Sequence, residues 1–216
     1  YEYATIPAPL KIPTPPAPKT KRGVAVRLFR EVVFFESLFH SAKWTWLFGW
    51  LFHFALLLAF FRHLRYATDP VWFWVSWEIV QAAGHYAAYM MLLGLIGLLV
   101  RRIFVDRVRH ISAPSDYLIL ILIIGIALSG LMMKWYPTDI FALKQFIIGL
   151  IYFSWSELPS DFMLLLHLGL VLLLMIIFPY SKLLHAPGLF FSPTRNQTDT
   201  ARDSRHIADW ARKLES

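Results

Sequence analysis

Four long apolar stretches determine what this chain of 216 residues can fold into. They cover approximately residues 44–64, 71–100, 116–133 and 161–180. Each is about as long as the 20 or so apolar residues that a helix needs to cross the ~30 Å hydrocarbon core of a bilayer. With 57% hydrophobic residues and a mean hydropathy of +0.52, the sequence predicts an all-α, polytopic membrane helix bundle with four spans.

The segments outside these spans are more polar. Residues 1–43 combine a proline-rich strap with a charged, apolar segment over 24–40 that predicts a helix lying along the membrane surface. Residues 44–185 form the expected membrane domain, and 186–216 form a tail. The apolar segment 141–155 is short and contains Lys144, so we expect it to be a surface or re-entrant piece.

The distribution of lysine and arginine predicts the orientation. Counted over the loops and ends, 17 of these residues fall on one side of the four spans and 4 on the other. The positive side is normally cytoplasmic, which places both ends of this sequence in the cytoplasm of a bacterial or archaeal cell. We expect the charge of +7 to report this orientation rather than nucleic-acid binding, and we expect a further span upstream of Tyr1.

Histidines inside the apolar stretches are the strongest functional signal. His53 and His63 lie in the first span, His167 lies in the last, and His185 follows it. Ionisable residues inside a bilayer are costly and usually face the interior of the bundle. The chain has no cysteine, so an iron–sulfur cluster or a disulfide is excluded within it.

The spacing of the four histidines favours two metal-binding pairs. The first and last spans are predicted to run in opposite directions, so His63 can oppose His167 at one depth and His53 can oppose His185 at another. Two imidazoles from facing helices are common axial ligands of haem iron. Zinc is a weaker alternative because the sequence offers neither cysteine nor an HExxH pattern, and hydrogen-bonded packing histidines are the other alternative. The pairing at His185 requires either tilted helices or a helix distortion at Pro179.

The chain resembles the membrane cytochrome b of the respiratory nitrate reductase gamma subunit family. The resemblance covers nearly everything from Trp44 to His185. It rests on the ten-residue and eighteen-residue histidine intervals, on LLVRRIFVDRVRHISAPSDYLIL, and on LLHLGLVLLLMIIFPYSKLLH. The family implies five spans and two b haems, one held by His63 and His167 and the other by His53 and His185.

A finer resemblance concerns the two ends of the chain. The stretches YEYATIPAPLKIPTPPAP and KLLHAPGLFFSPTRNQ most resemble the DsrM-type cytochrome b of the sulfite-reductase-linked DsrMKJOP complexes. This resemblance implies oxidation of menaquinol, electron transfer through two haems, and a cytoplasmic iron–sulfur partner of the DsrK type in dissimilatory sulfur metabolism. It also implies further membrane and periplasmic subunits. Nitrate reductase gamma and heterodisulfide reductase membrane subunits are the related alternatives.

A polar helical face in the second span is the candidate quinone site. Glu78, Gln81 and His85 are spaced i, i+3 and i+7, so they share one face that starts near the predicted outer surface. Quinol oxidation needs a proton acceptor near an electron acceptor, and we expect Glu78 to be that base. A snorkelling Glu78 and a packing His85 are one alternative, and Glu157 and Asp161, at the outer start of the last span, are competing proton relays.

A membrane-spanning chain of this kind could also serve two other classes of function. A non-catalytic membrane anchor for soluble subunits would need no haem, and a haem carrier would not need four histidines at two depths. Haem bound tightly and in a fixed ratio distinguishes the cytochrome from both.

Overall fold

The computed structural model describes residues 16–136 and 138–199. These residues form helices, turns and loops and contain no β-strand. They divide into two compact units, one within residues 38–181 and one of residues 16–37 with 182–199. The α-helices are α1 (Lys21–Phe34), α2 (Glu36–Ser41), α3 (Lys43–Ala67), α4 (Glu78–Phe104), α5 (Asp106–His110), α6 (Pro114–Met132), α7 (Ile140–Ile151), α8 (Phe162–Ile177), α9 (His185–Phe190) and α10 (Pro193–Asn196). Two short 3₁₀ segments, Phe178–Tyr180 and Lys182–Leu184, follow α8.

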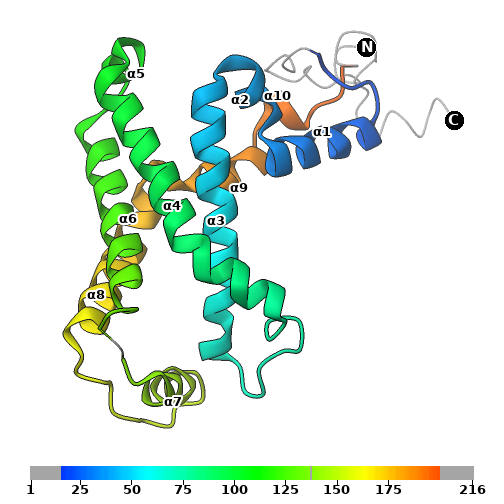
Figure 1. Ribbon diagram of the computed structural model, residues 1–216. Coiled ribbons are helices and arrows are strands. Elements are labelled where there is room, and N and C mark those ends of the chain that lie inside the picture. Colours follow the sequence, from blue (N-terminus) through cyan, green and yellow to red (C-terminus); the bar gives the residue numbers. More distant parts are fainter. Residues whose placement is uncertain (1–15, 137, 200–216) are drawn as a thin grey trace, which may run out of the picture. The chain divides into compact units, whose positions relative to one another are not determined.

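The unit of residues 38–181 is built from four long helices (Figure 1). Helix α4 packs against both α3 and α6, and α8 packs on α6. Close approach of α3 and α4 depends on small residues, since Ala55 is fully buried and a Cβ added to Gly94 would lie 2.9 Å from the carbonyl oxygen of Phe48. Small residues at such a contact are typical of helices that associate inside membranes.

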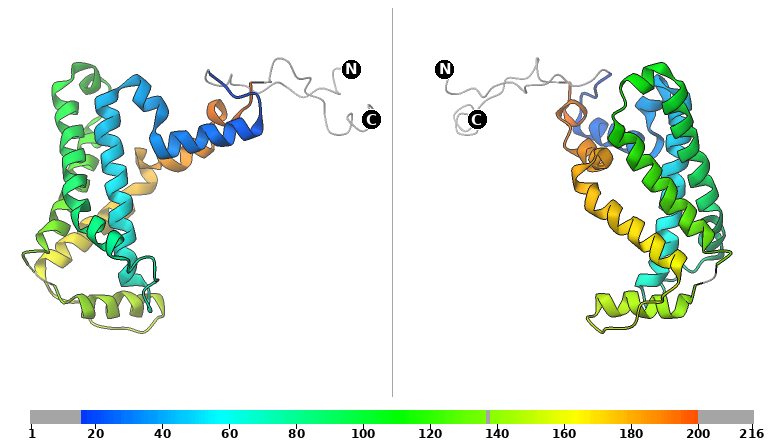
Figure 2. Two further views of the ribbon diagram at one scale, coloured as in Figure 1. Left: turned by 45° about the vertical axis from the view of Figure 1, so that its right-hand side comes forward. Right: turned by 90° about the vertical axis from the view of Figure 1, so that its left-hand side faces the viewer.

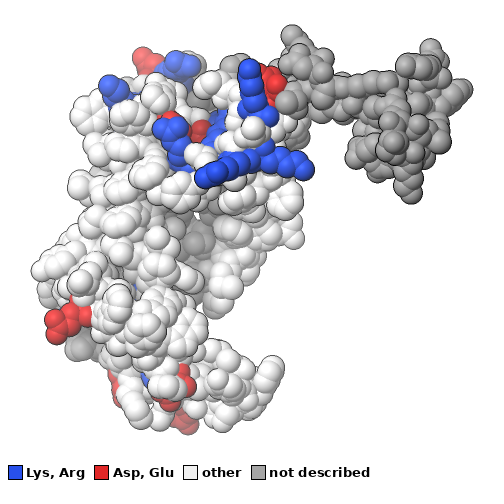
Figure 3. Space-filling model, turned by 90° about the vertical axis from the view of Figure 1, so that its right-hand side faces the viewer, with Lys and Arg blue, Asp and Glu red and all other residues white. Residues whose placement is uncertain are grey.

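Four helical segments of this unit are long and apolar enough to cross a bilayer: α3, α4, α6 and Phe162–Tyr180. They contain 25, 27, 19 and 19 residues, which agrees with the four predicted spans. The surface of these helices that faces the viewer in Figure 3 carries few charged residues along its middle. Because apolar side chains cover this surface, it matches the hydrocarbon core of a membrane.

The second span begins later than the sequence predicted. Residues 71–77 form a turn and loop, and α4 starts at Glu78. The amide of Val75 donates to the carbonyl of Trp72, and the Gln81 side chain donates to the carbonyl of Val75 at 2.7 Å. These contacts hold the aromatic segment in a turn, although its composition is as apolar as that of a span.

The last span is interrupted before His185. Helix α8 ends at Ile177, and Phe178–Tyr180 is a 3₁₀ segment that contains Pro179. A proline inside a helix removes one backbone hydrogen bond and clashes with the preceding turn. The predicted distortion is therefore present, and His185 begins the separate helix α9 instead of continuing the helical face of His167.

Helix α7 runs across one end of the four long helices (Figure 2). It has 12 residues, which is too short to span the bilayer. Its Lys144 forms an ion pair with Asp69 at 2.8 Å, and it packs against α3. The apolar segment predicted to be a surface or re-entrant piece is therefore this short helix.

In the other unit, α1 ends at Phe35, which has a left-handed backbone conformation with φ of 51°. The predicted surface helix over 24–40 is thus broken into α1 and α2. Glu31 accepts hydrogen bonds from Ser37 and forms an ion pair with Arg195, which also donates to the Ser37 hydroxyl at 2.6 Å. This contact fixes the segment around α10 against α1. Expectations for the strap over 1–15 and the tail over 200–216 lie outside the described residues.

Acidification is expected to release α10 from α1. Burial raises the pKa of Glu31, but the hydrogen bonds from Ser37 and the charge of Arg195 outweigh it, so the pKa lies below its ordinary value. The ionised Glu31 carboxylate therefore contributes its full stabilisation above the unfolded carboxyl pKa of about 4.3. This stabilisation is lost as the pH falls through the lower pKa of the folded state. We expect hydrogen-exchange protection of 193–196 to fall about fivefold to tenfold between pH 7 and pH 3, after correction for intrinsic rates. Arg195→Gln should remove the pH dependence, and equal protection of wild type at both pH values would contradict it.

Candidate haem and quinone sites

His63 and His167 lie side by side between α3 and α8. Their ring centroids are 6.4 Å apart and their planes differ by 17°. The two helices run in opposite directions, so they bring residues from distant parts of the sequence to one depth (Figure 2). This is the juxtaposition that antiparallel spans predicted for the outer pair.

The two rings, with centroids 6.4 Å apart, are close enough for both to bind one metal ion placed between them. Nearly parallel ring planes are compatible with that arrangement. The donor set of two neutral imidazoles from facing helices is also the one that b-type haem uses.

Each imidazole makes a hydrogen bond through Nδ1, which leaves its Nε2 as the nitrogen that can bind a metal. The Nδ1 atom of His63 lies 2.6 Å from the carbonyl oxygen of Ala59, which can only accept. The Nδ1 atom of His167 lies 3.0 Å from the Ser129 hydroxyl oxygen, whose own proton goes to the carbonyl of Ile126 at 3.0 Å. Both histidines therefore carry hydrogen on Nδ1 and the lone pair on Nε2, as metal-bound histidines usually do.

The backbone of α6 leaves space for the His167 ring. A Cβ added to Gly130 would lie 3.1 Å from Cε1 of His167, closer than an ordinary van der Waals contact. Ser129 is buried in the same turn, with 4% of its surface exposed. Sequence reasoning missed these two positioning residues, although a serine and a glycine inside an apolar span are typical of close helix contacts.

His53 and His185 occupy different units. His53 is half-buried on α3, and its Nδ1 lies 2.7 Å from the carbonyl oxygen of Gly49. His185 is exposed at the start of α9, and its Nδ1 lies 3.0 Å from the carbonyl oxygen of Lys182. His110 on α5 makes a similar contact to Asp106, so this contact alone does not identify a ligand. The predicted inner pair stays a prediction.

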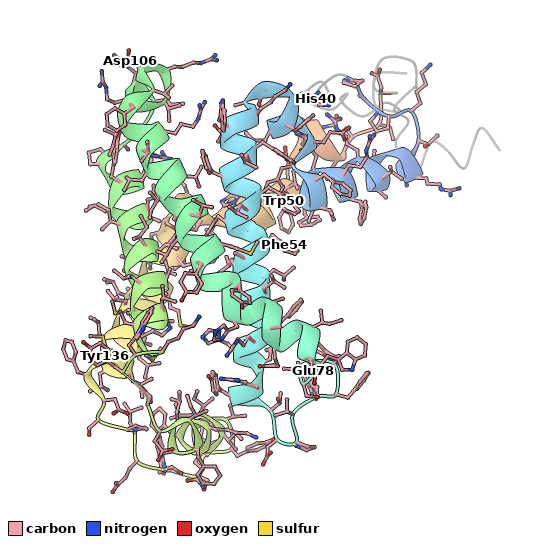
Figure 4. The ribbon with its side chains drawn as sticks, in the orientation of Figure 1. His40, Trp50, Phe54, Glu78, Asp106 and Tyr136 are labelled. Carbon is pink, nitrogen blue, oxygen red and sulfur yellow. The ribbon has the colours of Figure 1, made fainter. Side chains whose placement is uncertain are left out.

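Of the predicted quinone-site residues, Glu78 lies at the opposite end of the four long helices from Asp106 (Figure 4). Glu78 is the first residue of α4 and is exposed, in a position where the helix dipole favours a carboxylate. His85 is also exposed, and its ring contacts Tyr86 edge-on at 5.5 Å. Both side chains are therefore accessible from the surface of the helix bundle.

Gln81 differs from its two neighbours because its side chain is engaged. Its Oε1 accepts from Arg65 at 3.3 Å, its Nε2 donates to Val75, and its carbonyl accepts from Arg62 at 2.9 Å. These contacts tie the start of α4 to the end of α3. Gln81 is better suited to position this region than to exchange a proton with a quinol.

The described residues contain no group of three or more histidines and carboxylates that could hold one ion. A tetrahedral zinc site, the alternative considered for the histidines, therefore has no ligand set in that part of the chain. Pairs of imidazoles remain the candidate metal ligands.

Comparison with known proteins places the chain in a family. Residues 36–199 match the nitrate reductase gamma subunit family. The chain belongs to the nitrate reductase gamma subunit family. This match covers all four candidate spans and His53, His63, His167 and His185. Membership, together with the four apolar helices, makes the chain a multi-pass membrane protein.

Two members of this family group from archaea are similar over most of the chain. One, the "Hdr-like menaquinol oxidoreductase cytochrome b-like subunit" of Archaeoglobus fulgidus, is 36% identical over 90% of this chain and 66% of the relative. The protein of the same description from Archaeoglobus profundus is 31% identical over 97% of this chain and 76% of the relative. This chain thus spans between about two thirds and three quarters of the length of these relatives.

Proposed function

We propose that this chain is a membrane cytochrome b subunit that takes electrons from menaquinol and passes them through two b haems to a cytoplasmic iron–sulfur partner. The facing His63 and His167 imidazoles are the observation that carries this proposal. Family membership supports it, because the family model covers the whole histidine-bearing region. The names of the archaeal relatives, which describe menaquinol oxidoreductase subunits, support the quinone as substrate.

The chain's own residues would hold the haems and set their orientation. His63 and His167 would hold the outer haem, with Ser129 and the Ala59 carbonyl fixing their tautomers. His53 and His185 would do the same for the inner haem. Bound haem iron supplies a one-electron carrier, which a chain without cysteine or redox-active clusters requires for electron transfer.

The exposed face of α4 would accept the quinol. Glu78 would take a proton from the quinol hydroxyl, and its position at the helix start would allow release to the predicted outer side. His85 would lie deeper along the same face, about 10 Å further along the helix at 1.5 Å per residue. Gln81 would fix this face against α3 through its contacts with Arg62 and Arg65.

The proposed partner is a soluble iron–sulfur subunit of the DsrK type in dissimilatory sulfur metabolism. The relatives are described as Hdr-like, which also favours a subunit of the heterodisulfide reductase type as the electron acceptor. The same proposal includes a complex with further membrane and periplasmic subunits. It also places the C-terminal end in the cytoplasm and a fifth span in the complete bundle.

Menaquinol oxidation can be tested at Glu78. Glu78→Gln removes the carboxylate that would accept a proton, so we expect the rate of haem reduction by a menaquinol analogue to fall about 10²-fold or more, with unchanged haem content. Stopped-flow absorbance of the haem Soret band measures this rate. Asp106→Asn, which changes an exposed carboxylate at the opposite end of the long helices (Figure 4), is the control and should leave the rate unchanged. An unchanged rate in Glu78→Gln would reject Glu78 as the base.

A further inference from the structure

Three cationic side chains gather at the end of the bundle that carries His63 and His167. Arg62 and Arg65 flank His63 on α3, and Lys134 follows α6. Arg62 and Lys134 donate to the carbonyls of Gln81 and His85, which are four residues apart on α4, so the two cations lie on neighbouring turns of that helix. These three residues are called the outer cation cluster below.

No carboxylate of the described residues lies within ion-pair distance of the outer cation cluster. Asp69, at the same end of the bundle, is paired with Lys144 at 2.8 Å. At the other end of the long helices, Arg102 pairs with Asp116 at 3.2 Å. Three like charges at the edge of a low-dielectric region are costly unless an anion compensates them.

The cluster is held in place by backbone and neutral groups. Arg62 donates to the carbonyl of Gln81, and Lys134 donates to the carbonyl of His85 at 2.8 Å. The ammonium of Lys134 also lies 4.5 Å from the centre of the Tyr89 ring. A Cβ added to Gly84 would lie 2.9 Å from Cδ of Arg62, so this glycine makes room for the arginine stem. None of these contacts neutralises charge.

Unused donors remain in the cluster. The Nε atom of Arg65 is buried and has no hydrogen-bond partner, while its two terminal nitrogens reach the Gln81 side chain and the Tyr66 hydroxyl. A buried guanidinium nitrogen without an acceptor is destabilising. The site therefore lacks both a negative charge and a hydrogen-bond acceptor.

The cluster is adjacent to the paired imidazoles through two chain segments. Arg62 directly precedes His63. Lys134 lies four residues after Gly130, whose backbone lies against the His167 ring, and two residues beyond the end of α6. An anion bound to the cluster would thus lie beside any group held between the two rings.

We infer that Arg62, Arg65 and Lys134 form a carboxylate site for the two propionate groups of the porphyrin held by His63 and His167. This inference rests on the proposed function, because it needs a haem between those rings. Propionates supply two negative charges and four acceptor oxygens, which match the missing charge and acceptor. The chain would then orient the haem through its carboxylates as well as through its iron.

The test is a redox titration of the purified Lys134→Met and Arg65→Met variants in detergent. Haem absorbance reports the reduced fraction at each potential. Loss of a positive charge disfavours the reduced haem, which carries one more negative charge than the oxidised form. We expect the equilibrium constant for reduction of one haem to fall about tenfold in each variant, or about 59 mV for a one-electron couple, while the second haem is unchanged. Lys134→Arg keeps the charge and should restore the wild-type potential. Lys144→Met, whose ammonium is already paired with Asp69, is the control and should leave both potentials unchanged.

Haem content distinguishes the possible failures. If both variants keep two haems and both potentials stay at wild-type values, the inference is wrong while the haem assignment stands. The inference is also wrong if the potentials change only in vesicles containing phosphatidylglycerol, since the anion would then be a lipid phosphate. It is equally wrong if only the affinity for a menaquinol analogue falls. A wild-type protein without haem would overturn the proposed function and this inference together.

Discussion

Replacing His63 with alanine is expected to lower the haem content from two b haems per chain to one. An iron held by two imidazoles loses half of its axial ligands, and the methyl group of alanine supplies no donor. His167→Ala should have the same effect, because its ring faces His63 at 6.4 Å. The pyridine haemochrome assay on purified protein measures the ratio, and a redox titration should show the same remaining haem in both variants.

His110→Ala is the matched control for these variants. His110 makes a similar Nδ1 contact to a carbonyl oxygen four residues earlier, at 2.7 Å, but it lies on α5, outside the spans. This variant should keep both haems. Two haems in His63→Ala, or different remaining haems in His63→Ala and His167→Ala, would contradict the assignment of these residues to one iron.

Replacing Gly94 with leucine is expected to separate α3 from α4. The Cβ position at Gly94 is 2.9 Å from the carbonyl oxygen of Phe48 and 3.0 Å from the amide nitrogen of Phe52. Both are backbone atoms, so the clash cannot be relieved by rotating a side chain. Overpacking of this kind costs about 3 kcal/mol or more, which corresponds to an apparent melting temperature lower by roughly 6–12 °C. Thermal unfolding in detergent, with haem retention as a second readout, measures the effect.

Gly169→Leu provides the comparison for Gly94→Leu. It makes the same change of residue in α8, but nothing lies within 4 Å of the added Cβ. We expect its melting temperature to remain within about 2 °C of the wild-type value, as for surface substitutions. Equal melting temperatures for the two variants would show that the α3–α4 contact does not hold the bundle together.

The four spans could be predicted because the bilayer imposes a minimum length and an apolar composition on every crossing helix. The apolar stretches therefore correspond to α3, α4, α6 and the segment from Phe162 to Tyr180. The start of the second span could not be read in this way. Residues 71–77 are aromatic and apolar, yet they form a turn and loop in which the Gln81 side chain donates to the carbonyl of Val75.

The distortion before His185 was predictable from Pro179, whose ring is incompatible with a regular helix. Its extent was not, because two short 3₁₀ segments separate α8 from α9. Likewise, the left-handed backbone of Phe35 breaks the expected surface helix without a glycine or proline to signal it. Such breaks depend on contacts with side chains of neighbouring elements. Here Ser37 donates to the Glu31 carboxylate and Arg195 forms an ion pair with it.

The candidate site was predictable in part. Spacing and antiparallel spans were sufficient to expect His63 opposite His167, and the two rings do lie together. Ser129, Gly130 and Lys134 were missed because their roles arise only when α6 is placed beside α8 and α4. A single sequence shows that a serine or glycine is present in a span but not which ring it meets.

Haem content of the double variant His63→Ala/His167→Ala tests the central claim most directly. If both imidazoles bind one iron, the second substitution removes a ligand from a haem already lost, and the double variant retains one haem per chain, as each single variant does. If the two histidines serve different haems, the double variant loses both. A value of zero in the double variant, with one haem in each single variant and a folded protein, would contradict the account.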